Sequence, residues 1–301
     1  YLLLVMFNTL KYRKFWFTIS GLIILFGVIS LSLYGLKLGI DFKGGTISEL
    51  QFENKYDITK IKETLNAQDL KNYQLQATEN NGLIIKTESL EKDKHDILLE
   101  ALKKQVGNFQ ETKFDSIGPV VGKELKRSAI YQLLIVSLGI VAYIAYAFRK
   151  VPKPITSWRF GWSAVVALIH DLLFMLGVFS ILGHYKGIEV DSLFVTAILT
   201  VLGFSTHDTI VVFDRIRENL KIYAGQSLEF VINHSIGQTI VRSLNTSLTV
   251  LFVLLTLLLF GGETIRYFVL ALFIGVIVGT YSSIFIASPV LYIWQKWRTK
   301  T

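Results

Sequence analysis

A histidine and an aspartate stand inside an apolar stretch of this chain, where side chains that exchange protons are unusual. The run from Gly203 to Asn219 reads GFSTHDTIVVFDRIREN and places His207 and Asp208 within an expected membrane helix. A carboxyl in a lipid-embedded helix costs about 2.5–3.5 kcal/mol on insertion scales, so it is usually kept for a partner or a task. We therefore predict that Asp208 belongs to a proton pathway. His207 is the weaker candidate, because neighbouring side chains on a helix point about 100° apart.

Asp208 also has a structural alternative, in which it ends a helix at the membrane surface and Asp214 marks the true boundary. The apolar residues from Ile210 to Phe213 still follow Asp208, which favours a position within the bilayer. Burial and a nearby cation act on a carboxyl in opposite directions. A group placed between those effects can bind and release protons near neutral pH.

Arg242 is the natural cation for Asp208. It belongs to a set of polar residues at helical spacing on an otherwise apolar stretch, the polar stripe: Gln238, Arg242, Asn245, Thr246 and Thr249. Because contact with lipid is unfavourable for these polar side chains, we expect the polar stripe to face the interior of the helix bundle and Arg242 to face Asp208. The alternative is an Arg242 that reaches toward lipid headgroups.

Two further membrane segments carry notable residues. His170 and Asp171 lie near the middle of a third apolar stretch, where they could pass a proton or simply hold neighbouring helices together. In the last stretch, small residues recur every four positions and predict close helix packing. These are Ala271, Gly275, Gly279, Ser283 and Ala287.

The composition agrees with a membrane protein. The chain has 301 residues, of which 51% are hydrophobic and 18% charged, with a mean hydropathy of +0.47. Cysteine is absent, which excludes disulfides, thiolate chemistry and Cys-ligated metals. The net charge of +8 does not indicate nucleic acid, because the basic residues flank apolar stretches.

Six stretches reach the ~20 apolar residues that a membrane helix needs. We expect them at 15–37, 130–148, 160–182, 190–213, 236–260 and 267–294, the last five belonging to a membrane domain at 127–301. The first is too long for a signal peptide and lacks a cleavage site of small residues. Cations flank the spans mainly on one side. They are Lys11, Arg13, Lys14, Arg149, Lys150, Lys153, Arg159, Arg215, Arg217, Lys221, Lys296, Arg298 and Lys300. The positive-inside rule then places both termini, including residues 1–14, in the cytoplasm and the long segment 38–126 outside.

The outer segment 38–126 has the alternation of a small α+β domain. Strands are expected at 46–53, 73–78, 83–87 and 109–117, with helices at 57–68 and 90–106. This βαββαβ order is the ferredoxin-like pattern. The segment shows no metal cluster, phosphate loop or nucleophile elbow, so a binding or lever module is favoured over an enzyme.

Two short motifs flank this domain. DFKGGT, from Asp41 to Thr46, precedes it, and GPVVGKEL, with Gly122 and Glu124, follows it. Gly44 and Gly45 allow backbone angles closed to other residues and predict a tight turn onto the sheet. A phosphate-binding nest is the alternative, but no basic cluster supports it.

These motifs together resemble the SecF branch of the SecD/SecF family of protein-export membrane subunits. The matching segments are DFKGGT, VGKEL, His170-Asp171, GFSTHDTIVVFDRIREN, RSLNTSLT from Arg242 and VGTYSSIFIASP from Val278. They cover essentially the whole chain. SecD is similar but has a larger outer region. The chain departs from the family at His207, where the usual residue before the Asp is Asn.

The resemblance implies a polytopic six-span half of an RND-type transporter in the bacterial inner membrane. It implies a heterodimer with SecD that works with SecYEG, SecA, YajC and YidC on unfolded exported polypeptide. It implies no enzymatic activity and no cofactor other than protons as the coupling ion. Asp208 and Arg242 take the proton-pathway roles, with Asn245 and Thr246 beside them, and the outer domain tilts at Gly44-Gly45 and Gly118-Pro119 when Asp208 is protonated. The alternatives are a half-transporter for a lipid or small hydrophobic molecule and a scaffold subunit without coupling.

Overall fold

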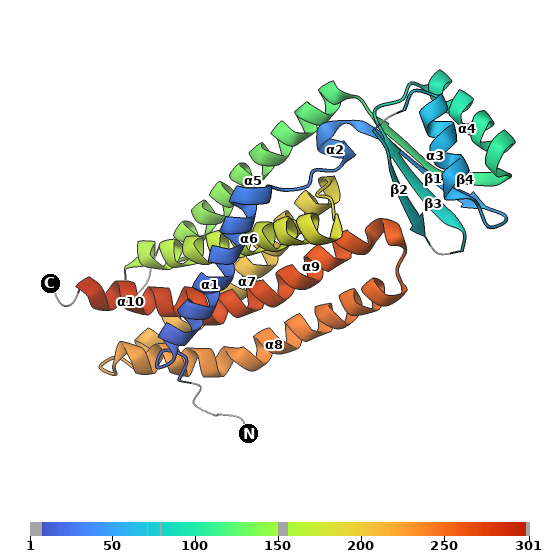
Figure 1. Ribbon diagram of the computed structural model, residues 1–301. Coiled ribbons are helices and arrows are strands. Elements are labelled where there is room, and N and C mark those ends of the chain that lie inside the picture. The colour runs from blue at the N-terminus through green and yellow to red at the C-terminus, as the bar shows by residue number, and fades with distance from the viewer. Residues whose placement is uncertain (1–7, 71, 79, 150–155, 299–301) are drawn as a thin grey trace. The chain divides into compact units, whose positions relative to one another are not determined.

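The computed structural model describes residues 8–70, 72–78, 80–149 and 156–298. Lys150, Lys153 and Lys300, which entered the orientation argument, lie outside these residues. The chain divides into two compact units, which we call the helical unit (1–37 and 132–301) and the ferredoxin-like unit (38–131) (Figure 1). The predicted fold class, six membrane helices with a small α+β domain, is confirmed.

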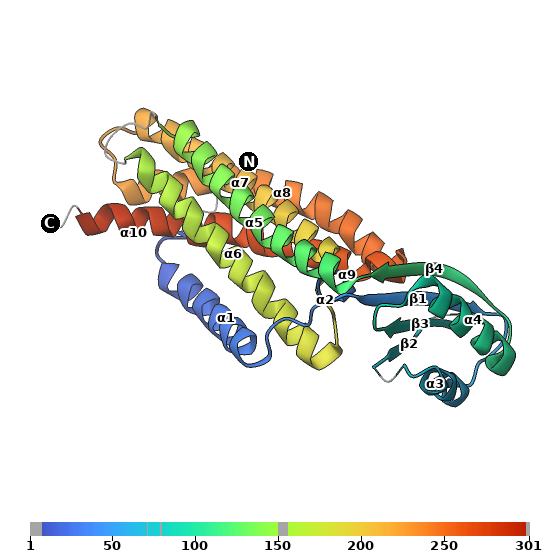
Figure 2. The ribbon, with the colours of Figure 1, turned by 90° about the horizontal axis from the view of Figure 1, so that it is seen from above.

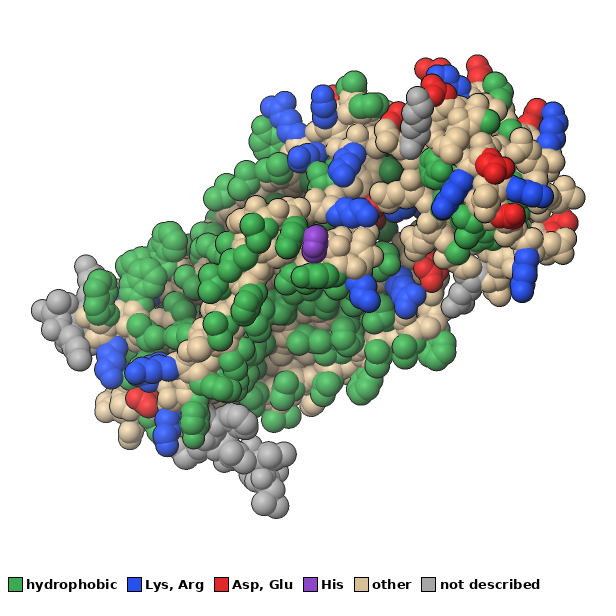
Figure 3. All heavy atoms as spheres, viewed as in Figure 1, with side chains coloured by type: hydrophobic (Ala, Val, Ile, Leu, Met, Phe, Trp, Pro, Cys, Tyr) green, Lys and Arg blue, Asp and Glu red, His purple; other side chains and the backbone are tan. Residues whose placement is uncertain are grey.

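Six helical stretches among the described residues are long and apolar enough to cross a membrane. Five are single helices: α1 (Arg13–Tyr34), α5 (Pro119–Ala147), α6 (Ser157–Lys186), α7 (Ser192–Ile222) and α8 (Leu228–Phe260). The sixth is composite, with α9 (Glu263–Ser282), the π-helix η1 (Ser283–Ala287) and α10 (Ser288–Arg298). Figure 3 shows hydrophobic side chains over most of the helical unit on the face drawn, as lipid contact requires.

Local signals in the sequence explain where several of these helices begin and end. Asp191 caps α7 by accepting a hydrogen bond from the backbone N–H of Phe194 at 2.8 Å, and Ser227 caps α8 in the same way. Gly187 ends α6 in the left-handed conformation, with φ of 71°. Such caps satisfy N–H and C=O groups that have no partner within the helix.

The helical unit packs around aromatic rings and close backbone approaches. Phe160 of α6 stacks on Phe148 and meets Phe213 of α7 edge-on, and all three are buried. The glycines of α9 lie against α7, because a Cβ on Gly275 would reach 2.1 Å from Val201 and one on Gly279 2.8 Å from Ser205. Figure 2 shows α1 beside α6, and these two helices are in contact.

The ferredoxin-like unit holds one antiparallel sheet with two helices. In chain order it contains α2 (Ile40–Lys43), β1 (Gly45–Phe52), α3 (Ile58–Ala67), β2 (Gln74–Thr78), β3 (Gly82–Thr87), α4 (Lys92–Val106) and β4 (Phe109–Ile117). The strand order is β2-β3-β1-β4, with β1 paired to both β3 and β4. The core between sheet and helices includes Leu50, Ile61, Leu65, Leu83 and Leu102.

The two glycine motifs meet within the ferredoxin-like unit. A Cβ on Gly122 would lie 2.9 Å from the backbone N of Gly44, and one on Gly44 would lie 3.0 Å from the Cα of Pro119. Gly44 and Gly45 have φ of 79° and 143°, which favour glycine. The turn predicted at Gly44 and Gly45 is confirmed, and Asp41, which begins the motif, lies in the short helix α2 just before it.

The structure differs from the sequence prediction at the second motif. Gly122 and Glu124 lie inside α5, which starts at Pro119, well before the apolar stretch predicted at 130–148. Proline at the first helical position has no N–H to leave unpaired, so the helix can start there although its first turns are polar. The exposed Glu124 side chain therefore belongs to a helix surface rather than to a flexible connector.

Candidate functional site

Asp208 lies inside the helix bundle rather than at a helix end. Its side chain is only 7% exposed, and it stands in the middle of α7. The hydroxyl of Ser283, the first residue of η1, donates a hydrogen bond to Asp208 Oδ2. The alternative that Asp208 marks the end of a helix is therefore wrong, because α7 continues to Ile222.

Asp171 forms a second buried acid site on α6. The residue is fully buried, and His170 Nδ1 lies 3.0 Å from its Oδ1. Its other oxygen, Oδ2, accepts hydrogen bonds from Ser205 Oγ of α7 at 2.5 Å and Ser282 Oγ of α9 at 2.8 Å. Asp171 thus joins three helices through polar contacts inside an apolar bundle.

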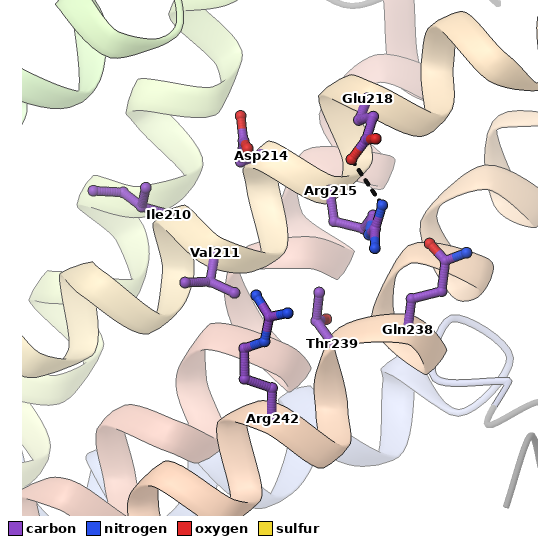
Figure 4. Close-up of a pocket in the computed structure, with 8 residues that line it drawn as sticks. All are labelled: Ile210, Val211, Asp214, Arg215, Glu218, Gln238, Thr239 and Arg242. Carbon is purple, nitrogen blue, oxygen red and sulfur yellow. Dashed lines mark hydrogen bonds and ion pairs between the residues drawn. The ribbon is translucent and has the colours of Figure 1, made fainter. Parts of the chain in front are cut away.

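Arg242 does not pair with Asp208. Among the ion pairs between described residues, none joins Arg242 to an acid. Arg242 is exposed on this chain and lines an open pocket between α7 and α8. Figure 4 shows its guanidinium directed toward α7 between Val211 and Thr239, whereas Asp214 points away from it.

Arg242 does not pair with Asp208 because of how α8 is rotated and how it is aligned along α7. Asn219 of α7 donates to Ser235 and Gln238 of α8, at 2.8 Å each, which fixes how these antiparallel helices align. Four residues farther along α8, Arg242 lies beside Val211 of α7, in the pocket that both residues line (Figure 4). The buried face of α8 instead carries Ser243 and Ser247. The sequence prediction that the two residues face each other is therefore wrong for this chain.

The rest of the polar stripe is also exposed. Asn245, Thr246 and Thr249 have exposed side chains on the same side of α8 as Arg242. His207 is exposed as well, although its neighbour Asp208 is buried. The polar stripe therefore does not face the interior formed by this chain alone.

Sequence reasoning missed the hydroxyls that hold the two acids. Ser205 and Ser282 were not singled out, and Ser283 was predicted only as a small packing residue. Consecutive serines in YSSIF, which run directly into a π-helix, were the available signal, because π-helical turns are frequent at functional sites. No group of three or more His, Cys, Asp or Glu that could hold a metal occurs among the described residues.

Two buried carboxyls held by hydroxyls are suited to binding protons, because no Lys or Arg among the described residues pairs with either of them. The fold and this site together define a class: a polytopic membrane protein with a ferredoxin-like domain between its first two spans. The family model of the SecD/SecF protein export membrane protein C-terminal region matches residues 97–297, and the SecD/SecF GG motif matches residues 29–55. The chain belongs to the SecD/SecF family.

Relatives and solved structures agree with this family assignment. The chain is 47% identical over 305 residues to the protein translocase subunit SecF of Thermobaculum terrenum, covering 96% of this chain and 94% of that one. It is 41% identical to SecF of Anaerolinea thermophila, covering 97% and 96%. It is also similar to the crystal structure of SecDF from Thermus thermophilus, described as a translocon-associated membrane protein. That match has a TM-score of 0.83 and 30% identity, and covers 96% of this chain but only 39% of the SecDF chain.

Proposed function

We propose that this chain is a SecF-like subunit of the Sec protein-export machinery and that it uses proton binding at Asp208 to promote late steps of polypeptide translocation. The relatives named SecF support the export role. Proton coupling is supported by one observation above all: Asp208 is buried in the middle of a membrane helix and held by a hydroxyl rather than by a cation. The relatives named as protein translocase subunits support a transport role rather than an enzymatic one.

The proposed energetics follow from the charge. One elementary charge that crosses 100 mV supplies ~2.3 kcal/mol, which shifts a two-state equilibrium considerably. Protonation of Asp208 neutralises it and changes the contact with Ser283, so that α7 and η1 repack. The ferredoxin-like domain, proposed to lie on the outer side, transmits that change to unfolded exported polypeptide.

The proposed partners include a second membrane subunit of SecD type. SecDF, the solved relative, contains far more chain than the part that this protein matches. The exposed polar stripe supports such a partner, because Arg242, Asn245 and Thr246 are costly against lipid. Arg242 then faces the SecD subunit. SecYEG, SecA, YajC and YidC complete the proposed assembly, in the bacterial inner membrane with both termini cytoplasmic.

The test uses inverted membrane vesicles that contain this chain with SecD, SecYEG and SecA. Translocation of a preprotein is measured with and without an uncoupler. Asp208→Asn is expected to remove the part of export that depends on the proton gradient, because an amide cannot bind and release a proton. Glu263→Gln, which changes an exposed carboxyl in a surface ion pair with Arg266, serves as the control and retains that part.

The same vesicles separate coupling from a scaffold role. If Asp208→Asn lowers recovery of SecD with this chain, while export keeps its proton dependence, the scaffold alternative holds. Normal assembly with lost proton dependence supports the proposal. If Asp208→Asn leaves export unchanged both with and without the uncoupler, the proposal is contradicted.

A further inference from the structure

The two buried acids, Asp171 and Asp208, are connected by adjacent serines. Ser282, at the end of α9, donates to Asp171, and Ser283, at the start of η1, donates to Asp208. Ser205 lies three residues before Asp208 on the same face of α7 and also donates to Asp171. The π-helix therefore begins where one chain segment contacts acids on two different helices.

Ser282 and Ser283 each have a second hydrogen-bond acceptor within reach. Ser282 Oγ lies 3.2 Å from the carbonyl oxygen of Gly279, and Ser283 Oγ lies 3.0 Å from that of Thr280. A hydroxyl has one proton to donate and two lone pairs with which to accept. A charged carboxylate is the stronger acceptor, because hydrogen bonds to ionised groups are about twice as strong as neutral ones.

The same hydroxyl can therefore serve either form of the acid. When the carboxyl is charged, the serine donates to it. When the carboxyl is protonated, it donates to the serine oxygen, and the serine donates to its own helix carbonyl. Neither state leaves the carboxyl or the serine hydroxyl without a partner, which removes the cost that would otherwise lock the acid in one form.

His170 extends this network on the far side of Asp171. Its Nδ1 contacts Asp171, while its buried Nε2 has no hydrogen-bond partner among the described residues. With the proton on Nδ1, Nε2 presents a free lone pair that can accept a proton beside a carboxylate. The ring of Tyr281, a further titratable residue, has its centre 6.2 Å from that of His170. On the side of α8, the charged residues Asp214, Arg215, Glu218 and Arg242 line the pocket between α7 and α8.

From this geometry we propose that Asp171, with His170, is a second proton-binding site of the chain, and that Ser282 and Ser283 couple its occupancy to that of Asp208. The proposal rests on the proposed proton-binding role of Asp208 and deepens it. Ser282 and Ser283 act as positioning residues. The two serines are neighbours at the junction of α9 and η1. When one hydroxyl changes its acceptor from an acid to a helix carbonyl, the local backbone geometry that positions the other serine changes too.

The test is infrared spectroscopy of the full chain in lipid vesicles, titrated with pH. Protonated buried carboxyls give C=O bands, and Asp171→Asn and Asp208→Asn are each expected to remove one band. Coupling predicts that Asp171→Asn shifts the pH at which the Asp208 band appears by at least about one unit. Ser282→Ala and Ser283→Ala are expected to reduce that mutual shift, and Ser282→Thr and Ser283→Thr to restore it.

The matched control is Ser247→Ala. Ser247 is also a buried serine, but it bridges α8 and α9 through the neutral hydroxyl of Thr280 at 2.6 Å. Its loss should leave both bands and their midpoints in place. The inference is overturned if Asp171 gives no titrating band, or if Asp171→Asn leaves the Asp208 titration unchanged. Because these bands do not depend on export, they report separately from the vesicle assay of the proposed function.

Discussion

Gly27 of α1 and Gly177 of α6 lie backbone to backbone in the helical unit. A Cβ built on Gly177 would stand 2.5 Å from the Cα of Gly27, and one on Gly27 would stand 2.9 Å from the Cα of Gly177. The hydroxyls of Ser30 and Ser180, one turn farther along, hydrogen bond across the same contact at 2.8 Å. Small residues that let backbones approach, with a polar bond between them, hold helices together in lipid.

The first prediction concerns this contact. Gly177→Ala forces α1 and α6 apart, because the new methyl group meets backbone atoms that cannot turn aside. The expected loss is about 1–3 kcal/mol in the free energy of unfolding, as for other overpacked sites. Unfolding of the protein in detergent micelles measures it. Gly21→Ala, on the facing helix α1 with nothing within 4 Å, is the control and should cost nothing. Equal stability of the two variants would contradict the prediction.

The second prediction concerns the meeting of the glycine motifs. Gly122→Ala places a methyl group against the backbone of Gly44, so the start of α5 must move away from α2. We expect faster proteolysis of the segment around Gly44 and Gly45, measured by limited digestion of the full chain. Gly118→Ala, which meets nothing within 4 Å, should be digested like the unmodified chain. Similar digestion of both variants would show that the close approach does not hold the junction.

The third prediction concerns pH and the cap of α3. Asp57 accepts a hydrogen bond from the backbone N–H of Thr59 at 2.8 Å, and hydrogen bonds from Thr59 lower the pKa of this carboxyl. Its pKa is thus lower in the folded than in the unfolded chain. The stabilisation is full above the unfolded value, near 3.9, and is lost as the pH falls through the folded value.

Asp57→Asn keeps an acceptor for the same N–H but removes the titration, because Asn also caps helices. The thermal midpoint of the ferredoxin-like unit, followed in the full chain by circular dichroism, should therefore fall less steeply for the variant below pH 4. At neutral pH the two proteins should differ little. If the thermal midpoint of the variant fell with pH as steeply as that of the original chain, Asp57 would not contribute to the acid sensitivity.

Local patterns in the sequence were sufficient to predict the ferredoxin-like unit. The alternation of strands β1 and β3, which predicted them, depends on only a few residues, and so does the turn between β2 and β3. Asn80 and Asn81 adopt φ of 56° and 61°, as a tight hairpin requires. Such signals need no knowledge of the rest of the fold, so the βαββαβ order could be derived before the structure was known.

The partner of Asp208 could not be derived in this way. Helical spacing identifies which residues share a face, but not which neighbour that face meets. Arg242 was predicted as the contact because a cation attracts a carboxylate, whereas Ser283 was assigned to helix packing. The alignment of α7 and α8 by Asn219, and the π-helical turn at Ser283, decide the outcome, and both depend on contacts between distant segments.

The last prediction concerns the exposed polar stripe of α8. Asn245 and Leu244 are neighbours on this helix, so they lie at nearly the same depth but about 100° apart around it, and both are exposed. If the polar stripe meets a SecD subunit, a photo-crosslinking amino acid in place of Asn245 should capture that subunit in membranes that contain both proteins. The same amino acid in place of Leu244 should give much less product, because lipid faces that side. Equal capture from both positions, or capture from Leu244 alone, would place the partner on another face and leave Arg242 to the lipid headgroups.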